Sequence, residues 1–416
     1  MWVAPAFLFA KILFMGKKGN PAHREQLSGA VGFWSNSYGA PTGYGQQTTY
    51  MIDRLVRHGL DVANFSNFGL EGKIDTIKTP YGEVKHFPRS FTGYSQDTAP
   101  LDHMTWANSV GKKDVFFTLY DAWVLDSPLY MDMRKIWSWM PLDHLTLQSR
   151  NREWAQRPNV LPITMAPFGK RQLDNAGIDN VYIPHGIETK IYKESWVLPT
   201  GQDVRDYWKT RDKFVVGMVA ANKASGLMHR KAFGENLMAF SIFRKKHDDA
   251  VLYLHTDVTG SGIGWNLMEL LNSLGVPQDS VLFVNPLEYR YGSAKETLAC
   301  YYTAMDVLLA PSLGEGFGVP TIEAQACGTR VIASSWAASE DLVAEDGWLV
   351  SGTPAWDAGQ SAWWQVPSVP SIVDALELAY AAGKEKSETA KKFASDFDVE
   401  KVWARDWMPL LRKEFG

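Results

Sequence analysis

Apolar runs of strand length alternate with helical patterns along the first half of the chain. Residues 30–34, 60–65 and 115–119 are short runs rich in Val, Phe and Leu, typical of strands that are buried on both faces. Between the first two lies a helical pattern of about four turns, which is expected to end at Gly59. Strands that alternate with helices in this way predict a parallel α/β sheet.

The same alternation returns in the second half of the chain. Residues 214–219 form an apolar run of strand type, and a helical pattern follows over 232–247. Further strands and helices are expected in turn at 251–255, 264–274, 281–284, 293–304, 307–310 and 330–333. A polar, charged connection over 189–213 separates the two halves. With 416 residues, the chain is too long for one ordinary core and is expected to form two domains.

Five segments follow from these patterns. They are an apolar N-terminal extension (1–28), a first Rossmann-like domain (29–190), a linker (191–213), a second Rossmann-like domain (214–395) and a C-terminal helix (396–416). The last helix carries Trp403, Trp407 and Leu411 on one face. That apolar face predicts packing against a domain, which we expect to be the first.

Two aromatic-rich stretches show no clear period. Residues 80–113 are rich in Pro, Gly and aromatic side chains. A segment of this length without periodicity is typically a functional or a disordered loop. The Trp-rich tract 354–367 is expected to be a surface loop.

The composition is that of a soluble globular protein, with 45% hydrophobic and 21% charged residues. The net charge of −4 gives no overall attraction to nucleic acid or to an anionic membrane, so either would require a local basic patch. Cys300 and Cys327 lie in apolar helical surroundings. They are expected to be buried free thiols in a reducing cytosol.

The N-terminal residues are apolar without forming a membrane span. Residues 2–15 are too short to cross a bilayer and are interrupted by Lys11. Lys17 and Lys18 follow the apolar run, whereas a secretory signal carries its positive charge before it. Three interpretations compete: an upstream start ahead of Met15, a packing extension, and a peripheral membrane helix. No integral membrane span is expected, and the expected location is cytoplasmic.

The stretch 305–328 carries the strongest chemical pattern. An apolar run over 307–310 leads into a glycine-rich loop, 314–318. Pro320 then suits the first turn of a helix and Gly328 suits its end. Strand, glycine loop and helix together direct backbone N–H groups and the positive end of a helix dipole toward an anion.

Two carboxylates, Glu315 and Glu323, stand in this stretch. Beside a phosphate they would repel the ligand, unless each accepts hydrogen bonds from hydroxyl groups. A nucleotide diphosphate sugar has one anionic centre with hydroxyl-rich groups on both sides and satisfies both requirements. An acidic first helical turn is the simpler alternative, and it explains Glu323 but neither Glu315 nor the glycines.

The sequence EGFGVPTIEA over residues 315–324 resembles the donor-site signature of the retaining family-4 glycosyltransferases of the GT-B fold. The resemblance implies an α/β protein with two Rossmann-like, doubly wound parallel-sheet domains that face each other across a cleft, and a C-terminal helix that returns to the first domain. It implies that the first domain (29–190) binds the acceptor, the molecule that receives the sugar, and that the second domain (214–395) binds the nucleotide-sugar donor. It also implies that Glu315 contacts the transferred sugar and that Glu323 holds the ribose hydroxyls. The other expected donor-binding residues of this loop are Gly316, Phe317 and Gly318.

A second glycine pattern lies near the start of the first domain. Gly43-x-Gly45-x-x-Thr48 nearly fits a dinucleotide fingerprint, but its third glycine is missing and no acid ends the second strand, which argues against a nicotinamide enzyme. The resemblance implies that Gly43, Tyr44 and Gly45 approach the donor phosphate. It also implies that Asp121, at a strand end, lies near the acceptor hydroxyl. A plain turn at the glycines and a capping role for Asp121 are the alternatives.

A basic loop follows the first strand of the second domain. Cations there can neutralise a diphosphate leaving group. Related transferases usually have an arginine directly after this strand and a lysine several residues later. Lys231 matches the lysine, whereas Ala221 stands in the arginine's place, so Lys223 or Arg230 is expected to replace it. A solvated basic loop is the alternative. Ser312 is expected near the nucleotide base.

The resemblance implies sugar transfer with retention of configuration, with Glu315, Lys231 and Asp121 as catalytic residues. The His residues show no ligand spacing and no Asp-x-Asp ends a strand convincingly, so no metal is expected. No cofactor is expected beyond the donor, a UDP-, GDP- or ADP-sugar. The alternatives are a nucleotide-sugar epimerase, a phosphorylase and a non-catalytic nucleotide-sugar-binding protein.

The sequence leaves the identity of the acceptor open, and we assign the stretch 80–113 to contact with it. Residues 39–45 and 118–123 resemble segments of transferases encoded by bacteriophages. This resemblance implies one of two acceptors: hydroxymethylated pyrimidines in DNA, so that the reaction is a DNA modification, or virion proteins. The acidic net charge weakens the DNA interpretation, although a local basic rim and an extruded base would suffice. A protein, a lipid and a small molecule are the other acceptors considered.

Overall fold

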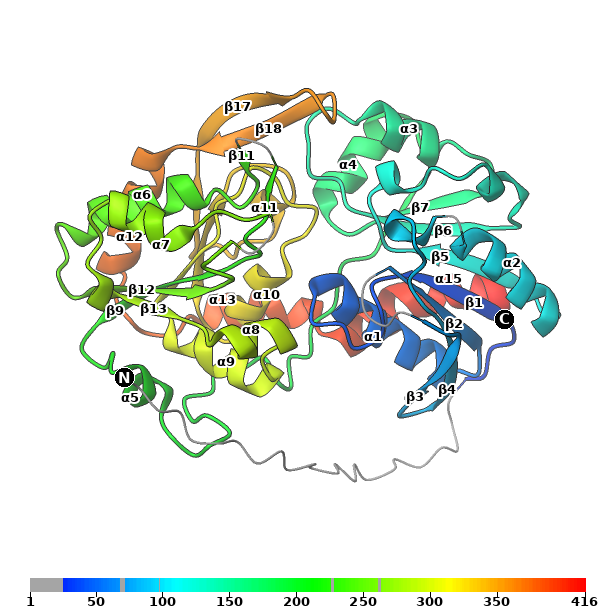
Figure 1. The fold of residues 1–416 in the computed structure, drawn as a ribbon, viewed down its shortest axis with the longest axis horizontal. Helices are drawn as coiled ribbons and strands as arrows, with labels where there is room; N and C mark the ends of the chain where they lie inside the picture. Colours follow the sequence, from blue (N-terminus) through cyan, green and yellow to red (C-terminus); the bar gives the residue numbers. More distant parts are fainter. Residues whose placement is uncertain (1–24, 68–71, 97, 226–227, 261–262) are drawn as a thin grey trace.

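The structure is a computed structural model that describes residues 25–67, 72–96, 98–225, 228–260 and 263–416. The apolar stretch 2–15 and most of the expected extension 1–28 lie outside the described residues. Two parallel sheets, each with helices beside it, organise the rest. Figure 1 shows the first sheet and its helices on the right and the second on the left.

Within the described residues, the first sheet has eight strands in the order β3-β4-β2-β1-β5-β6-β7-β8. Its neighbours run parallel except for the antiparallel hairpin β3–β4. The strands are β1 (Ala30–Ser35), β2 (Asp61–Ser66), β3 (Asp75–Thr79), β4 (Gly82–Phe87), β5 (Asp114–Thr118), β6 (Ile136–Met140), β7 (Val160–Thr164) and β8 (Val181–Tyr182). The helices are α1 (Gly43–Arg57), α2 (Ala99–Val110), α3 (Ser149–Ala155) and α4 (Pro167–Asn175).

The second sheet has six parallel strands among the described residues, in the order β13-β12-β9-β14-β15-β16. They are β9 (Phe214–Val219), β12 (Ala250–His255), β13 (Val281–Phe283), β14 (Val307–Leu309), β15 (Arg330–Ser334) and β16 (Trp348–Val350). The helices are α6 (Phe233–Arg244), α7 (Leu267–Ser273), α8 (Pro286–Tyr291), α9 (Lys295–Ala304), α10 (Val319–Ala326), α11 (Ala338–Asp341), α12 (Val369–Ala381) and α13 (Glu388–Ala394). Nearly every residue of β9 and β12 is buried, which explains why these strands read as continuous apolar runs.

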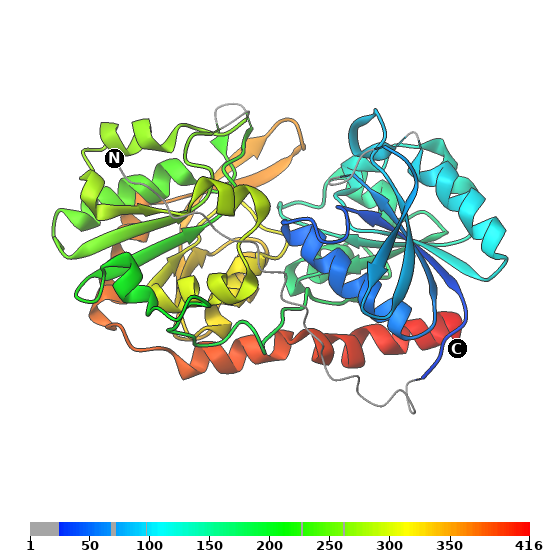
Figure 2. The ribbon, with the colours of Figure 1, turned by 60° about the horizontal axis from the view of Figure 1, so that its bottom comes forward.

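The C-terminal helix joins the two domains. It consists of α14 (Val399–Val402), a π-helical turn (Trp403–Trp407) and α15 (Met408–Phe415). Figure 2 shows it in red, running from beneath the second domain to beneath the first. The ring of Trp407 lies 5.4 Å from Phe117 and 5.1 Å from Trp139, both in the first sheet. The helix therefore returns to the first domain, as expected.

The stretch 80–113 is largely regular, contrary to the sequence interpretation. It contains the strand β4 and the helix α2. In β4, Val84 and His86 are buried between exposed neighbours, and in α2, His103 and Trp106 are buried. Because buried histidines count as polar in a periodicity search, they concealed both patterns.

The tract 354–367 is also regular, so the expected surface loop is wrong. It forms most of the antiparallel hairpin β17 (Gly352–Asp357) and β18 (Ala362–Pro367), shown at the top of Figure 1. The backbone of Trp363 pairs with Leu145 of the first domain in an isolated antiparallel bridge. The hairpin thus reaches across to the other domain.

Candidate active site

The glycine-rich loop between β14 and α10 lies against the first domain. A Cβ at Gly314 would be 2.3 Å from the carbonyl oxygen of Asp143, and one at Gly316 would be 2.4 Å from Cβ of Pro141. Gly318, with φ of +92°, adopts the backbone region that favours glycine at the start of α10. Gly314 and Gly316 therefore permit contact between the domains. The sequence pattern assigns the glycine loop only to binding an anion and does not predict this role.

The carboxylate of Glu315 is held by two cations. The Lys231 ammonium contacts Oε1, and Nη1 of Arg230 lies 3.3 Å from Oε2. Nη1 of Arg230 also donates to the carbonyl of Gly314 at 3.0 Å. Burial would raise the pKa of Glu315, but Lys231 and Arg230 together lower it below its ordinary value. The carboxylate is therefore ionised, and each of its oxygens can accept a further hydrogen bond.

A tight turn positions these cations. It connects the hairpin β10 (Ala224–Ser225) and β11 (Met228–His229) to α6, and Ala232 in the turn has φ of +48°. The N–H of Leu313 donates to the carbonyl of Arg230 at 2.8 Å, which ties the turn to the glycine loop. Lys223 is exposed, and no ion pair joins it to another described residue. Lys223 or Arg230 was expected to replace the arginine that is missing at position 221. The structure brings Arg230, and not Lys223, to Glu315.

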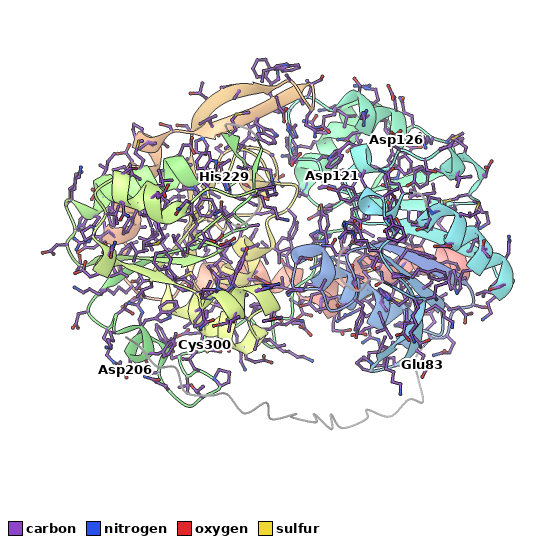
Figure 3. All side chains as sticks on the ribbon, in the orientation of Figure 1. Glu83, Asp121, Asp126, Asp206, His229 and Cys300 are labelled. Carbon is purple, nitrogen blue, oxygen red and sulfur yellow. The ribbon has the colours of Figure 1, made fainter. Side chains whose placement is uncertain are left out.

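Asp121 and Tyr44 face these cations from the first domain. Figure 3 shows Asp121 and His229, the neighbour of Arg230, on the facing sides of the two domains. Burial and the nearby Asp143 carboxylate raise the pKa of Asp121 to about 7, and Arg230 partly offsets this effect. Burial, followed by Asp121, also raises the pKa of Tyr44. The site can therefore present a carboxyl group that exchanges a proton near neutral pH.

The N-terminus of α1 carries the other two predicted glycines. A Cβ at Gly43 would meet no heavy atom within 4 Å, so this position is open. A Cβ at Gly45 would lie 2.3 Å from the carbonyl oxygen of Ala40, and its N–H donates to the Thr42 side chain at 3.0 Å. Gly45 therefore serves the local turn, whereas Gly43 leaves room for a ligand.

Glu323 is buried and joins the two domains. Its Oε2 accepts from the hydroxyl of Tyr302 at 2.9 Å, and its Oε1 accepts from Nε2 of Gln46 at 3.3 Å. Gln46 belongs to α1 of the first domain and also donates to Tyr50. Burial raises the pKa of Glu323, and these hydrogen bonds partly offset it. Groups of the protein thus occupy the carboxylate that the sequence assigned to ribose.

Ser312 and Phe317 differ in their surroundings. The N–H of Ser312 donates to Oγ of Ser334 at 3.0 Å, and the buried Ser312 hydroxyl has no hydrogen-bond partner among the described residues. Phe317 is buried, with its ring 5.0 Å from His185 and 5.8 Å from Phe397. The ring of Phe317 is therefore part of the core at the domain junction, and its assignment to donor binding stays a prediction.

The sequence interpretation missed Asp143 and His144, which follow β6. Nδ1 of His144 lies 2.6 Å from Oδ1 of Asp143, and the imidazole stacks on Trp364 of β18 with centroids 4.8 Å apart. The available signal was a polar pair just after the apolar run 136–140, at the same edge of the sheet as Asp121.

Further expectations concern metals, membranes and thiols. Across the described ranges, no group of three or more His, Cys, Asp or Glu side chains could hold a metal ion. In the same ranges, no helix is long and apolar enough to cross a bilayer. Cys300 and Cys327 are buried and form no disulfide, which confirms that part of the prediction.

Residues 199–359 match the family described as glycosyl transferases group 1. A D-inositol 3-phosphate glycosyltransferase 2 of Catenulispora acidiphila is 34% identical over 139 residues, which are 32% of this chain and 29% of that protein. The chain thus spans less than a third of that relative. A D-inositol 3-phosphate glycosyltransferase of Corynebacterium jeikeium is 24% identical over 313 residues, 68% of this chain and 73% of that protein. These matches support an enzymatic role.

Solved structures share the fold. A sucrose-phosphate synthase from Thermosynechococcus elongatus has a TM-score of 0.65 at 19% identity, covering 92% of this chain and 97% of that chain. Anabaena HepE in complex with UDP and glucose has a TM-score of 0.63 at 17% identity, covering 92% and 99%. The fold is GT-B, with two Rossmann-like α/β domains, as expected.

Proposed function

We propose that this chain, whose residues 199–359 belong to the glycosyl transferases of group 1, moves a sugar from a nucleotide diphosphate sugar to an acceptor hydroxyl with retention of configuration. The anomeric carbon loses its bond to the diphosphate oxygen and gains one to the acceptor oxygen. The acceptor proton passes to the leaving diphosphate. Protein cations, and not a metal, stabilise the leaving group.

One observation supports this proposal above the others: Arg230 and Lys231 converge on Glu315 beside the first domain. In glycosyl transfer, positive charge develops on the sugar ring while negative charge grows on the leaving diphosphate. Fixed cations placed where that negative charge develops lower the barrier without reorganisation. Glu315 keeps both cations in position and can accept hydrogen bonds from sugar hydroxyls.

On the acceptor side, we assign Asp121 and Tyr44 to contact with the hydroxyl that is glycosylated. Asp121 has a pKa raised to about 7 by burial and by Asp143. When ionised, its carboxylate accepts a hydrogen bond from the incoming hydroxyl and orients it toward the anomeric carbon.

The choice of substrates rests on the relatives. HepE is described in complexes with UDP and glucose and with UDP-glucose, so a UDP-sugar is the first donor to test, ahead of GDP- and ADP-sugars. Two relatives are named for D-inositol 3-phosphate. They favour a phosphorylated polyol as the acceptor over hydroxymethylated pyrimidines in DNA, a protein or a lipid.

Release of nucleotide diphosphate from UDP-glucose tests the proposal. It is measured with inositol 3-phosphate, with hydroxymethylated DNA and with no acceptor. We expect release that depends on an acceptor. Lys231→Ala and Glu315→Gln should each lower kcat by about 100-fold or more, the usual cost of removing a group that stabilises developing charge. Lys245→Ala, an exposed lysine at the end of α6, is the matched control and should keep full activity.

Two results would count against the proposal. Binding of nucleotide sugars without turnover in the presence of any acceptor would favour a binding protein, and conversion of the sugar without an acceptor would favour an epimerase. Full activity of both site variants would reject the assigned residues.

A further inference from the structure

The hairpin β17–β18 joins the first domain to the glycine loop by backbone hydrogen bonds. The N–H of Leu145 in the first domain donates to the carbonyl of Trp363 at 3.1 Å, and the N–H of Trp363 donates to the carbonyl of Leu145. Further along β18, the N–H of Gln365 donates to the carbonyl of Leu313 at 3.0 Å. The N–H of Leu313 donates in turn to the carbonyl of Arg230. A chain of contacts therefore runs from the first domain, through β18, to the turn that carries the site cations.

The side chain of Trp364 in β18 contacts both domains. It is 6% exposed and forms a buried apolar cluster with Ala232 and Leu313. Ala232 ends the turn of residues 230–232, here called the cation turn, and has φ of +48°. The Trp364 ring also stacks on the imidazole of His144 in the first domain, with centroids 4.8 Å apart. Because buried side chains are closely packed, loss of either ring would loosen the support of the cation turn.

Carboxylates from both domains hold the imidazole of His144. Its Nδ1 lies 2.6 Å from Oδ1 of Asp143, and its Nε2 lies 3.6 Å from Oδ2 of Asp357 in β17. Burial would raise the pKa of Asp143, but the hydrogen bond with His144 and the charge of Arg230 lower it below its ordinary value. Asp143 is therefore ionised and couples His144 to Arg230 by charge, in addition to the coupling through Trp364.

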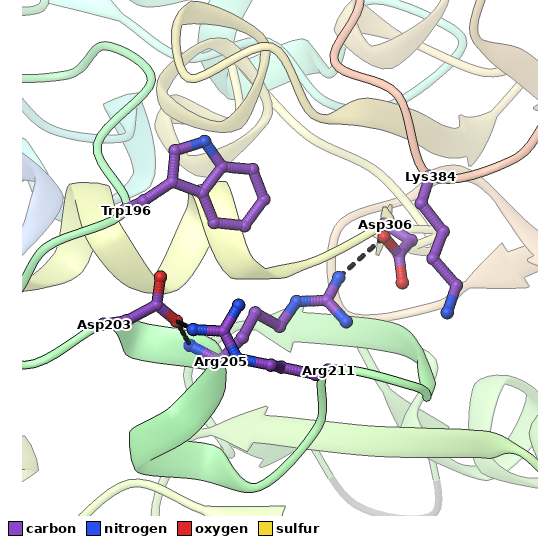
Figure 4. Close-up of a pocket in the computed structure, with 6 residues that line it drawn as sticks. All are labelled: Trp196, Asp203, Arg205, Arg211, Asp306 and Lys384. Atoms are coloured by element: carbon purple, nitrogen blue, oxygen red, sulfur yellow. Dashed lines mark hydrogen bonds and ion pairs between the residues drawn. The ribbon is translucent and has the colours of Figure 1, made fainter.

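The connection between the domains is tied to the second domain and lies elsewhere. In its helix α5 (Val204–Trp208), Nη2 of Arg205 lies 2.7 Å from Oδ1 of Asp306, which precedes β14. Figure 4 shows this ion pair in a pocket that is also lined by Arg211, whose Nη2 lies 2.6 Å from Asp206. Both arginines are thus already paired, and the Arg205 ion pair fastens α5 to the second domain. The hairpin, in contrast, contacts the first domain next to the candidate active site.

We propose that His144 and Trp364 are positioning residues for sugar transfer, whose stacked rings fix the cation turn relative to the acceptor side of the site. This inference rests on the proposed function. The cations of the turn stabilise charge that develops in the transition state, so their displacement lowers kcat more than it weakens donor binding. A misplacement of about 1 Å can cost about 100-fold in rate, and partial loss of support should cost at least about tenfold.

The kinetics of nucleotide release from UDP-glucose, with inositol 3-phosphate as acceptor, test the proposal. Trp364→Ala and His144→Ala should each lower kcat at least about tenfold and raise KM for the donor by less than about threefold. Trp364→Phe keeps a ring for the stack and should restore most of the lost rate. Trp356→Ala, which truncates a half-exposed tryptophan of the same hairpin, is the matched control and should keep the wild-type kcat.

The double variant His144→Ala/Trp364→Ala separates one shared role from two independent ones. Residues that act as a pair give non-additive losses, so the double variant should lose little more rate than either single variant. Thermal unfolding of each variant shows whether it is folded. His144→Ala leaves Trp364 in place and gives the same test should Trp364→Ala fail to fold.

A cross-link measures the contact of the hairpin with the first domain without any turnover. Leu145 and Trp363 form a hydrogen-bonded antiparallel pair, whose Cα atoms are typically about 5.5 Å apart, a distance that a disulfide spans. Leu145→Cys/Trp363→Cys should therefore form a disulfide on mild oxidation, since the native Cys300 and Cys327 are buried. The added change His144→Ala should slow its formation.

The outcomes distinguish this role from the transfer function. Full kcat of both single variants, with a wild type that releases nucleotide, overturns the positioning role and leaves the transfer function standing. Losses that multiply in the double variant, or an equal rise in KM and fall in kcat/KM with kcat unchanged, also overturn it. A wild type that releases no nucleotide with any donor rejects the transfer function, and this role with it, even if the disulfide forms.

Discussion

The variant Gly316→Ala tests whether catalysis requires contact between the glycine loop and the first domain. The new Cβ would lie 2.4 Å from Cβ and 2.9 Å from Cα of Pro141. Carbon atoms in ordinary contact are about 3.5–4.0 Å apart. Neither atom of Pro141 can rotate away, because one is backbone and the other belongs to a rigid ring. The loop and residue 141 must therefore separate by about 1 Å.

The separation also displaces Glu315, the loop residue that pairs with Arg230 and Lys231. Glu315 directly precedes Gly316, so the same shift moves Glu315 away from the segment of the first domain that contains Pro141 and Asp143. A misplacement of about 1 Å at an active site can cost about 100-fold in rate. That factor equals about 2.7 kcal/mol of transition-state stabilisation. We expect kcat/KM for nucleotide release to fall by about this factor, while calorimetry shows that both domains still unfold cooperatively.

Gly359→Ala is the control for this prediction. Gly359 is exposed in the turn between β17 and β18, has no positive φ, and its new Cβ would approach only the side-chain Oδ1 of Asp357, at 3.3 Å. Gly314→Ala should act like Gly316→Ala, since its Cβ would lie 2.3 Å from the carbonyl oxygen of Asp143. Wild-type turnover by both loop variants would refute the reasoning that closure of the domains on this loop assembles the site.

Three further predictions concern titration, packing and thiol access. Burial raises the pKa of Asp121 to about 7, above its ordinary value of about 3.9, so the folded state binds more protons between these values and loses stability as the pH rises. The melting temperature of Asp121→Asn minus that of the wild type should therefore increase from about pH 5 to about pH 8. A difference that stays constant over this range would contradict the raised pKa of Asp121. Trp407→Ala removes a buried ring that packs on Phe117 and should cost about 3–5 kcal/mol in urea unfolding, whereas a loss below about 1 kcal/mol would contradict that packing. Burial raises the pKa of Cys300 and Cys327, so a thiol reagent should modify neither until the protein is unfolded, and rapid native labelling would contradict their burial.

The strands of the second domain could be predicted because their burial leaves a simple mark in the sequence. The expected strand 214–219 coincides with β9, and 251–255 differs from β12 by one residue. Residues 30–34 likewise lack only the last residue of β1. Parallel strands that are covered on both faces must be apolar throughout, so an apolar run in the sequence gives both the position and the length of the strand.

Fewer elements of the first domain could be predicted from the sequence, because polar and aromatic residues are buried there. All five residues of β6 (Ile136–Met140) are buried, although Ser138 lies among them and accepts a hydrogen bond from Trp154 at 2.9 Å. No expectation was placed on that strand, so Asp143 and His144 at its end were missed. A sequence shows which residues are polar but not which partners satisfy them inside the fold.

The same limit explains the surroundings of Glu323. Its motif could be recognised, but Gln46 lies 277 positions away in the chain and belongs to the other domain. Tyr302 and Gln46 donate to the carboxylate as ribose hydroxyls would. Each carboxylate oxygen can accept two hydrogen bonds, so a ribose need not displace Tyr302. Gln46, at 3.3 Å, is the weaker partner and the one that separates when the domains part. A ligand hydroxyl that replaces Gln46 on Oε1 would break a contact between the domains, which would couple the binding of that ligand to their separation.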